Sequence, residues 1–265
     1  MTEQLLIGVL FAAIISVSSH LARFLTLSGS IAQFILGTIL LGLGGWQWTV
    51  PMLVFFVLSS MVSKIGKRRR ADADSLFEKS SRRDAWQVIA NGGVAGAITL
   101  IWLFTRLEVL YVAYLGAVAA ATADTWGTEL GTLSRSSAIL VTTFKRVESG
   151  RSGAISLLGT FAGVAGAFTI WLSSLPWLPF TQHCNILFAS LFGGMIGSLA
   201  DSFVGATLQA QYRCVVCRKL TERFIHCEQR TQIVSGFPWI GNDHVNLICT
   251  IIGAAIGLYL YGLLR

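Results

Sequence analysis

Eight apolar runs dominate this sequence, and each is long enough to cross a lipid bilayer. They cover residues 4–20, 31–45, 50–64, 86–104, 109–131, 153–175, 186–208 and 244–263. A transmembrane helix needs about 20 residues, and shorter runs span when their polar ends snorkel or the bilayer thins. The second and third runs are the shortest, so a re-entrant hairpin is the alternative there. The sequence predicts an all-α polytopic membrane protein, a bundle of about eight transmembrane helices forming a single domain over residues 1–265.

The composition agrees with a membrane protein. Only 12% of the residues are charged and 54% are hydrophobic, whereas a soluble domain carries about 25% charged residues. The first apolar run has no basic stretch before it and no clean cleavage site after it, so we expect a retained helix rather than a signal peptide. The net charge of +7 comes with no nucleic-acid-binding motif. We therefore expect the lipid bilayer, and no nucleic acid, as a partner.

The basic residues predict the orientation of the chain. Eighteen of the 20 lysines and arginines follow the first, third, fifth and seventh runs. Because cytoplasmic loops carry an excess of Lys and Arg, we predict cytoplasmic loops at 65–83, 134–152 and 209–243 and extracytoplasmic termini. The outer loops are short and almost uncharged. We therefore expect a multi-pass membrane protein with its active face in the cytoplasm.

Two aspartates lie toward the inner ends of apolar runs, where an unpaired carboxylate is costly. Each belongs to a ladder of residues, mostly small, spaced four apart: Gly116, Ala120, Asp124 and Thr128 in one run, and Gly193, Gly197, Asp201 and Gly205 in another. Residues four apart share a helix face, and small residues let helices approach closely. We therefore expect both carboxylates at helix–helix contacts, binding a metal ion or a substrate; the alternative is that each braces the bundle through an arginine.

Further polar residues flank the same ends of the runs. Glu129 lies roughly 140° around an ideal helix from Asp124, so the two can share an ion only if the helix breaks near Gly127; otherwise Glu129 pairs with Arg135. Arg82 and Arg83 precede a stripe that reaches Asn91, which we interpret as a site wall or a polar bundle contact. Asn242 and Asn246 share a helix face at the start of the last run. Asn242 can cap the helix, or both side chains can reach inward to contact a ligand.

The segment Lys145, Arg146, Val147, Glu148, Ser149, Gly150, Arg151, Ser152, Gly153 carries basic residues, glycine and serine directly before an apolar run. We expect this segment to open directly into a helix, where unpaired N–H groups at the helix start can bind an anion. The segment is not a Walker A motif, because no Gly-Lys-Ser/Thr lies in register. The alternative is a basic cytoplasmic loop with no ligand.

Four soft ligands lie in the last long loop. Cys214 and Cys217 form a Cys-x-x-Cys pair, and His226 and Cys227 follow. This set suits tetrahedral Zn²⁺. Because adjacent residues rarely ligate one ion together, three of the four with a water molecule is one alternative, and reduced free thiols are another.

Several stretches together resemble a known family. QVIANGG, ADTWGTELG, SGRSGAIS, GSLADSFVGATLQ, the Cys-x-x-Cys with its later His-Cys, and NDHVN occur in this order. They resemble the integral membrane family known as domain of unknown function 92, which includes the plant phytyl-phosphate kinases of vitamin E (tocopherol) synthesis and the animal transmembrane protein 19. Two positions differ from the pattern we expect: Asp243 stands for a second Asn, and Arg151-Ser152-Gly153 replaces a Gly-rich, Asn-containing form.

The resemblance implies a membrane kinase that transfers a phosphoryl group from a nucleoside triphosphate, CTP among the favoured donors, to a prenyl monophosphate such as phytyl phosphate. For this reaction we expect Asp124 and Asp201 to hold Mg²⁺, and the Cys/His loop is the candidate Zn²⁺ site. We assign catalytic roles to Asp124, Asp201, Arg82 and Asn91, and substrate or nucleotide contacts to Arg83, Glu129, Lys145, Arg146, Arg151, Ser152, Gln209, Asn242 and Asn246. The alternatives are a transporter or flippase for an anionic lipid or metabolite, and a related transferase acting on another membrane alcohol.

Overall fold

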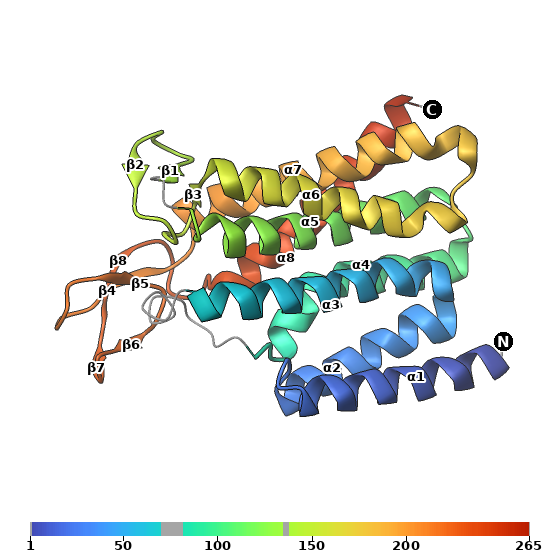
Figure 1. The fold of residues 1–265 in the computed structure, drawn as a ribbon, viewed down its shortest axis with the longest axis horizontal. Coiled ribbons are helices and arrows are strands. Elements are labelled where there is room, and N and C mark those ends of the chain that lie inside the picture. The colour runs from blue at the N-terminus through green and yellow to red at the C-terminus, as the bar shows by residue number, and fades with distance from the viewer. Residues whose placement is uncertain (1, 70–81, 135–137, 265) are drawn as a thin grey trace.

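The computed structural model describes residues 2–69, 82–134 and 138–264, without the side chains of 67–69. Within them lie eight helices long and apolar enough to cross a membrane. They are α1 (Thr2–Leu21), α2 (Leu27–Gly37) with the π-helical η1 (Thr38–Gly44), α3 (Trp46–Arg69), α4 (Ala85–Thr105), α5 (Val109–Gly131), α6 (Leu157–Ser174), α7 (His183–Thr207) and α8 (Asn242–Leu264). The eight-helix prediction is confirmed. The second and third spans are each long and apolar enough to cross the membrane, and each runs along the bundle, which favours two crossings over the re-entrant alternative (Figure 1).

The helices run roughly along the long axis of the molecule, with small strands gathered at one end and both termini at the other (Figure 1). Two 3₁₀ turns, η2 (Leu175–Trp177) and η3 (Phe180–Gln182), connect α6 to α7. The predicted loops 65–83 and 134–152 fall partly on residues 70–81 and 135–137, outside the described residues. The rest of the predicted cytoplasmic loops lies at the strand end.

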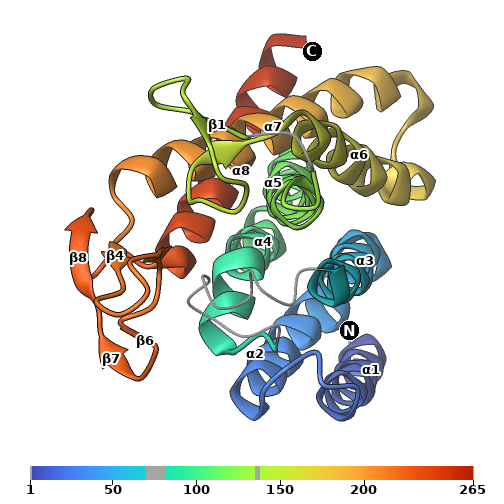
Figure 2. The same cartoon turned by 60° about the vertical axis from the view of Figure 1, so that its left-hand side comes forward.

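Helix α5 lies in the middle of the bundle (Figure 2). It is buried over 67% of its span, against 22–39% for the other seven helices, because its small and apolar side chains face every direction. Near its start, the Tyr111 hydroxyl donates to the carbonyl of Gln47 at 2.9 Å, and Tyr114 donates to the carbonyl of Trp48. Helix α1, by contrast, lies at an outer corner of the bundle (Figure 2).

Glycines bring α5, α7 and α8 into close contact. A Cβ added at Gly197 would lie 2.6 Å from Ala120 Cβ, and one at Gly193 would lie 2.8 Å from the carbonyl oxygen of Gly253. Such distances leave no room for a larger side chain, so the backbones approach as small-residue ladders allow. The two small-residue ladders that carry the aspartates therefore lie at helix–helix contacts, as predicted, and they pack against each other.

The loops at the strand end fold into small antiparallel sheets that the sequence analysis did not foresee. β1 (Ala138–Leu140) lies between β2 (Arg146–Val147) and β3 (Ala154–Ile155). After α7, β4 (Gln211–Arg213) lies between β5 (Leu220–Thr221) and β8 (Gln232–Ser235), and β6 (Ile225–His226) pairs with β7 (Gln229–Arg230). Strand β3 separates the 145–153 segment from α6, whose cap is Ser156. The prediction that this segment opens straight into a helix was therefore wrong.

Candidate active site

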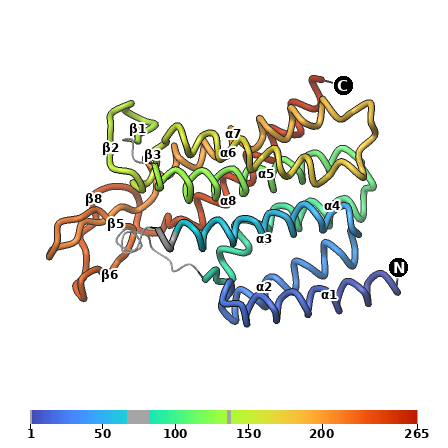
Figure 3. The backbone as a smooth tube through the Cα atoms, in the orientation of Figure 1, coloured from blue at the N-terminus to red at the C-terminus, as the bar shows by residue number. Residues whose placement is uncertain are grey.

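A cavity of about 270 Å³ lies at the strand end of the bundle, among α4, α5, α6, α7, α8 and the loops. The C-terminal ends of α5 and α7 and the start of α8 lie at the same end as the strands (Figure 3). Most of the predicted site residues line this cavity: Arg83, Asn91, Asp124, Glu129, Arg151, Ser152, Asp201, Gln209, Asn242 and Asn246. Segments that lie far apart in the sequence therefore supply one polar site.

The two aspartates meet inside the cavity. The Asp124 and Asp201 carboxyl groups interact directly, and the Ser198 hydroxyl donates to Asp124 Oδ1 at 3.5 Å. Asp201 Oδ2 is buried and has no hydrogen-bond partner among the described residues. Two carboxylates in contact repel each other strongly at low dielectric constant unless a proton or a cation neutralises them. This pair therefore has the chemistry of a cation site.

Glu129 lines the same cavity although α5 continues unbroken to Gly131. It reaches the site from another face of the helix and lies close enough to Arg83 to interact electrostatically. Arg135, its predicted partner, lies outside the described residues. Burial lowers the pKa of the Arg83 guanidinium to about 10, and Glu129 opposes that shift. Arg83 is therefore still cationic at neutral pH and available to bind an anion.

The entrance to α4 holds Arg83 in place through backbone contacts. The Arg83 N–H donates to the carbonyl of Phe24 at 3.0 Å, and its carbonyl accepts from the N–H of Thr26 at 3.0 Å. Asp84 then caps α4, accepting from the N–H of Gln87 at 3.0 Å while Gln87 Oε1 accepts from the N–H of Asp84. One turn later Asn91 Nδ2 donates to the carbonyl of Gln87 at 2.9 Å. The predicted polar stripe of α4 is thus a cap followed by a cavity wall.

The loop carrying Arg151 docks onto the end of α7. The Ser152 hydroxyl donates to Gln209 Oε1 at 2.8 Å. Gly153 has φ +77°, and a Cβ there would lie 2.6 Å from the carbonyl oxygen of Ser202. Only glycine combines this backbone conformation with so close an approach. The Gln209 amide nitrogen is buried without a hydrogen-bond partner among the described residues and is free to donate to a ligand.

Three of the predicted catalytic and substrate-binding residues do not line the cavity. Arg82 Nη2 donates to the carbonyl of Leu25 at 3.1 Å, which braces the segment before α4. Lys145 and Arg146 are exposed at the β2 hairpin. The phosphate contacts of Lys145 and Arg146 stay predictions, because neither residue lines the cavity.

The cavity also contains residues that the sequence analysis did not assign to the site. Ser198 lies three residues before Asp201 on the same helix face, and this spacing was a usable signal. Glu222 lines the cavity and interacts electrostatically with Asp201. No spacing pattern relates Glu222 to the aspartates, because only the fold of the 209–241 loop places it there.

The family described as "Integral membrane protein DUF92" matches residues 10–254. The chain belongs to this family. The match covers every helix of the bundle in whole or in part and all the cavity residues named above, so the polar site lies within the shared part of the DUF92 fold.

Relatives of this DUF92 protein occur in archaea and plants. It is 34% identical over 258 residues to "Uncharacterized membrane protein MJ0933" of Methanocaldococcus jannaschii, covering 97% of this chain and 94% of that protein. It is 30% identical over 268 residues to "Protein PGR" of Arabidopsis thaliana, covering 92% of each. It is 24% identical to "Protein VTE6, chloroplastic" of the same plant, covering 91% of this chain and 66% of that protein. No solved structure matches the chain.

Proposed function

We propose that this protein is a membrane kinase that transfers the γ-phosphoryl group of a nucleoside triphosphate to a prenyl monophosphate, giving the prenyl diphosphate. The observation that carries the proposal is the composition of the cavity: a carboxylate pair, two arginines and neutral amides surround one space at the strand end of a membrane bundle. The resemblance to the plant phytyl-phosphate kinases supplies the reaction class and a CTP-like donor.

Asp124 and Asp201 fit a magnesium ion. Their carboxyl groups are in direct contact, and one buried oxygen of Asp201 lacks a partner among the described residues. Mg²⁺ is bound through one or two carboxylates plus phosphate oxygens, and it neutralises charge that develops during phosphoryl transfer. Glu222 and Ser198 support the pair, because both lie beside it in the cavity lining.

Arginines and amides supply the phosphate contacts. Arg83, directly before α4, and Arg151, in the β2–β3 loop, both line the cavity. Guanidinium groups bind phosphates through parallel hydrogen bonds. Asn91, Gln209 and Asn246 add neutral polar side chains that orient a ligand without adding negative charge. In this arrangement the chain mainly positions two polyanions and reduces their repulsion.

The acceptor needs no dedicated base. A phosphate monoester has a second pKa of about 6, so one of its oxygens already attacks phosphorus at neutral pH. The new P–O bond forms at the γ-phosphorus while the bond to the β,γ-bridging oxygen breaks, and the nucleoside diphosphate leaves. The cavity agrees with this chemistry, because none of the described residues that line it is a histidine.

The prenyl tail reaches the cavity from the side of the bundle. Thr160 on α6 and Leu199 on α7 line the cavity, and both side chains are exposed, Leu199 by 44%. Met195 continues the apolar wall one turn further along α7. A lipid chain lying between α6 and α7 therefore places its phosphate beside the carboxylate pair while the tail stays in the hydrocarbon.

The opposite half of the bundle argues against a transporter. Trp48 is fully buried there, with its ring centroid 4.9 Å from that of Tyr114 and 5.2 Å from those of Trp102 and Tyr111. This aromatic cluster and the small apolar residues around the centre of α5 offer an anion no polar path among the described residues. A kinase requires access from one side only. We place that side in the cytoplasm, where the basic loops are expected.

The test uses purified protein in lipid nanodiscs with Mg²⁺, the four ribonucleoside triphosphates singly, and phytyl phosphate or geranylgeranyl phosphate. The expected products are the prenyl diphosphate and a nucleoside diphosphate, identified by mass. Release of a nucleoside monophosphate would indicate nucleotidyl transfer instead. A folded, monodisperse sample that turns over none of these combinations would contradict the proposal.

A further inference from the structure

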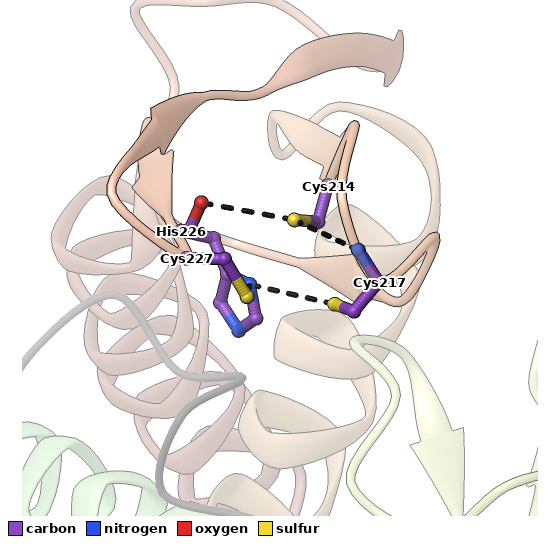
Figure 4. Close-up of side chains that lie close together, drawn as sticks. All are labelled: Cys214, Cys217, His226 and Cys227. Carbon is purple, nitrogen blue, oxygen red and sulfur yellow. Dashed lines mark hydrogen bonds between the residues drawn. The ribbon is translucent and has the colours of Figure 1, made fainter.

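The four soft ligands of the α7–α8 loop come together outside the cavity. The side chains of Cys214, Cys217, His226 and Cys227 point toward one another (Figure 4). Their ligand atoms all lie within 4.8 Å of one another. Cys217 Sγ lies 3.6 Å from His226 Nδ1, and Cys227 Sγ lies 3.2 Å from the same nitrogen.

These separations match the edges of a zinc tetrahedron. With Zn–S of about 2.3 Å and Zn–N of about 2.0–2.1 Å, tetrahedral angles put sulfur and nitrogen about 3.6 Å apart and two sulfurs about 3.8 Å apart. The distances from His226 Nδ1 to the two thiols are close to the first value. A cation at the centre therefore fits with only small movements of the side chains.

The backbone arranges the first ligand pair as a turn around sulfur. The N–H groups of Val216 and Cys217 point at Cys214 Sγ, at 3.4 and 3.5 Å. Arg218 then adopts a left-handed conformation with φ 61°, which reverses the chain directly after the second thiol. Backbone donors aimed at a sulfur stabilise the thiolate form that binds a metal and fix its orientation.

A second left-handed turn lets the adjacent residues His226 and Cys227 point toward the same ion. Successive side chains of a strand point to opposite faces, so His226 and Cys227 in extended backbone would point apart. Cys227 has φ 49° and Glu228 has φ 61°, and this turn brings both side chains to one side. Left-handed conformations are costly for residues other than glycine and persist where the surroundings require them. The geometry therefore favours four protein ligands over the alternative of three protein ligands and a water molecule.

We propose that Cys214, Cys217, His226 and Cys227 bind one structural Zn²⁺ in a closed S₃N site. Four protein ligands leave no open position, which is typical of structural rather than catalytic zinc. The 209–241 segment also needs such a link. It is short, and all four residues of β8 are exposed, so it buries little apolar surface, and domains of this size are commonly stabilised by a metal.

The zinc site holds a cavity residue in place. In the sequence Glu222 falls between the Cys214/Cys217 pair and the His226/Cys227 pair, and its side chain lines the cavity beside Asp201. The Thr231 hydroxyl is 2.9 Å from the carbonyl of Arg223 and 3.0 Å from that of Phe224, so the segment carrying Glu222 is anchored on one side by hydrogen bonds. The metal anchors it on the other. Its effect on turnover rests on the proposed kinase function, whereas zinc binding itself does not.

The first measurement is metal content of the full-length protein, purified in detergent without chelators. We expect about one zinc ion per chain, lost to below about one in five in Cys217→Ser and His226→Ala. Cys184→Ser is the matched control, because Cys184 is an exposed cysteine of α7 away from the cluster, and it should keep its zinc. A folded wild-type sample without zinc would overturn the proposal.

The second measurement uses Co²⁺ in place of zinc. The expected spectrum shows thiolate-to-cobalt charge transfer and the intense d–d bands of a tetrahedral site, and Cys227→Ser should lower the charge-transfer band by about a third, because one of three thiolates is lost. An unchanged spectrum in Cys227→Ser would refute the S₃N site. Limited proteolysis of the 209–241 segment gives a readout without turnover: the zinc-depleted protein should be cut faster. Zinc bound in a protein without kinase activity would refute the proposed function alone.

Discussion

Replacing Asp201 by Asn should stabilise the protein and inactivate it at the same time. In the cavity the Asp201 carboxyl interacts directly with that of Asp124, and one of its oxygens is buried without a partner among the described residues. Two unit charges about 4 Å apart repel by about 4 kcal/mol at an effective dielectric constant of about 20. Asn keeps the shape of the side chain and removes this repulsion.

A proton shared by the wild-type pair relieves part of the repulsion, so we expect a gain of about 1–3 kcal/mol in unfolding free energy without divalent cations. For a chain of this size each kcal/mol corresponds to about 2–4 °C in Tm. Tryptophan fluorescence during heating in detergent, with a chelator present, measures this shift. Adding Mg²⁺ should then raise the Tm of the wild type and leave that of Asp201→Asn nearly unchanged, because a ligand stabilises only the state that binds it.

Turnover should fall by at least about 100-fold in the same variant, since electrostatic stabilisation of the transition state is lost. Glu148→Gln is the control: Glu148 is exposed and lies outside the cavity lining, so its Tm, Mg²⁺ response and rate should stay at wild-type values. If Asp201→Asn melts below the wild type in chelator, or keeps its rate, the carboxylate pair is not a cation site and the reasoning fails.

Three further substitutions test other parts of the structure. Gly253→Leu should lower the unfolding free energy by about 1–3 kcal/mol through overpacking against α5, seen as a lower Tm and a lower folded yield. Gly262→Leu, where a Cβ meets nothing within 4 Å, should change neither; equal Tm values would contradict the close helix contact. Ser152→Ala removes the hydrogen bond to Gln209 and should cost about 0.5–1.5 kcal/mol, seen as a higher KM for the nucleotide. Leu199→Trp should raise the KM for a C20 prenyl phosphate several-fold and leave a short-chain analogue unaffected; the reverse order would exclude a tail between α6 and α7.

Much of the fold follows from the sequence because the bilayer permits few alternatives. Apolar length alone identifies the eight spans. Small residues at every fourth position are enough to predict that the helices of Asp124 and Asp201 make close contacts. The cavity residues on helices, Asn91 and Asn246 among them, were found for the same reason: a helix face can be computed from spacing.

The loops were harder to predict. The strands β1–β8 are two to four residues long, too short to leave a periodic pattern. Glu222 reaches the cavity only through the turns of the 209–241 segment, and those turns depend on left-handed residues such as Arg218 and Cys227 that local sequence does not favour. The sequence also could not distinguish Arg82 from Arg83. The structure does, because Arg83 lines the cavity whereas Arg82 donates to the backbone carbonyl of Leu25.

The central position of α5 has a consequence for how the chain is made. Its mean hydropathy of 1.2 is the lowest of the eight spans, and it carries the greatest buried share. A helix of such low mean hydropathy gains less from lipid than its neighbours when it leaves the ribosome, and its partners α6, α7 and α8 are still to be synthesised. The cavity is therefore complete only after α8 arrives, because α8 supplies Asn242 and Asn246. Truncation before α8 should leave a chain that the cell's quality control recognises as unfinished.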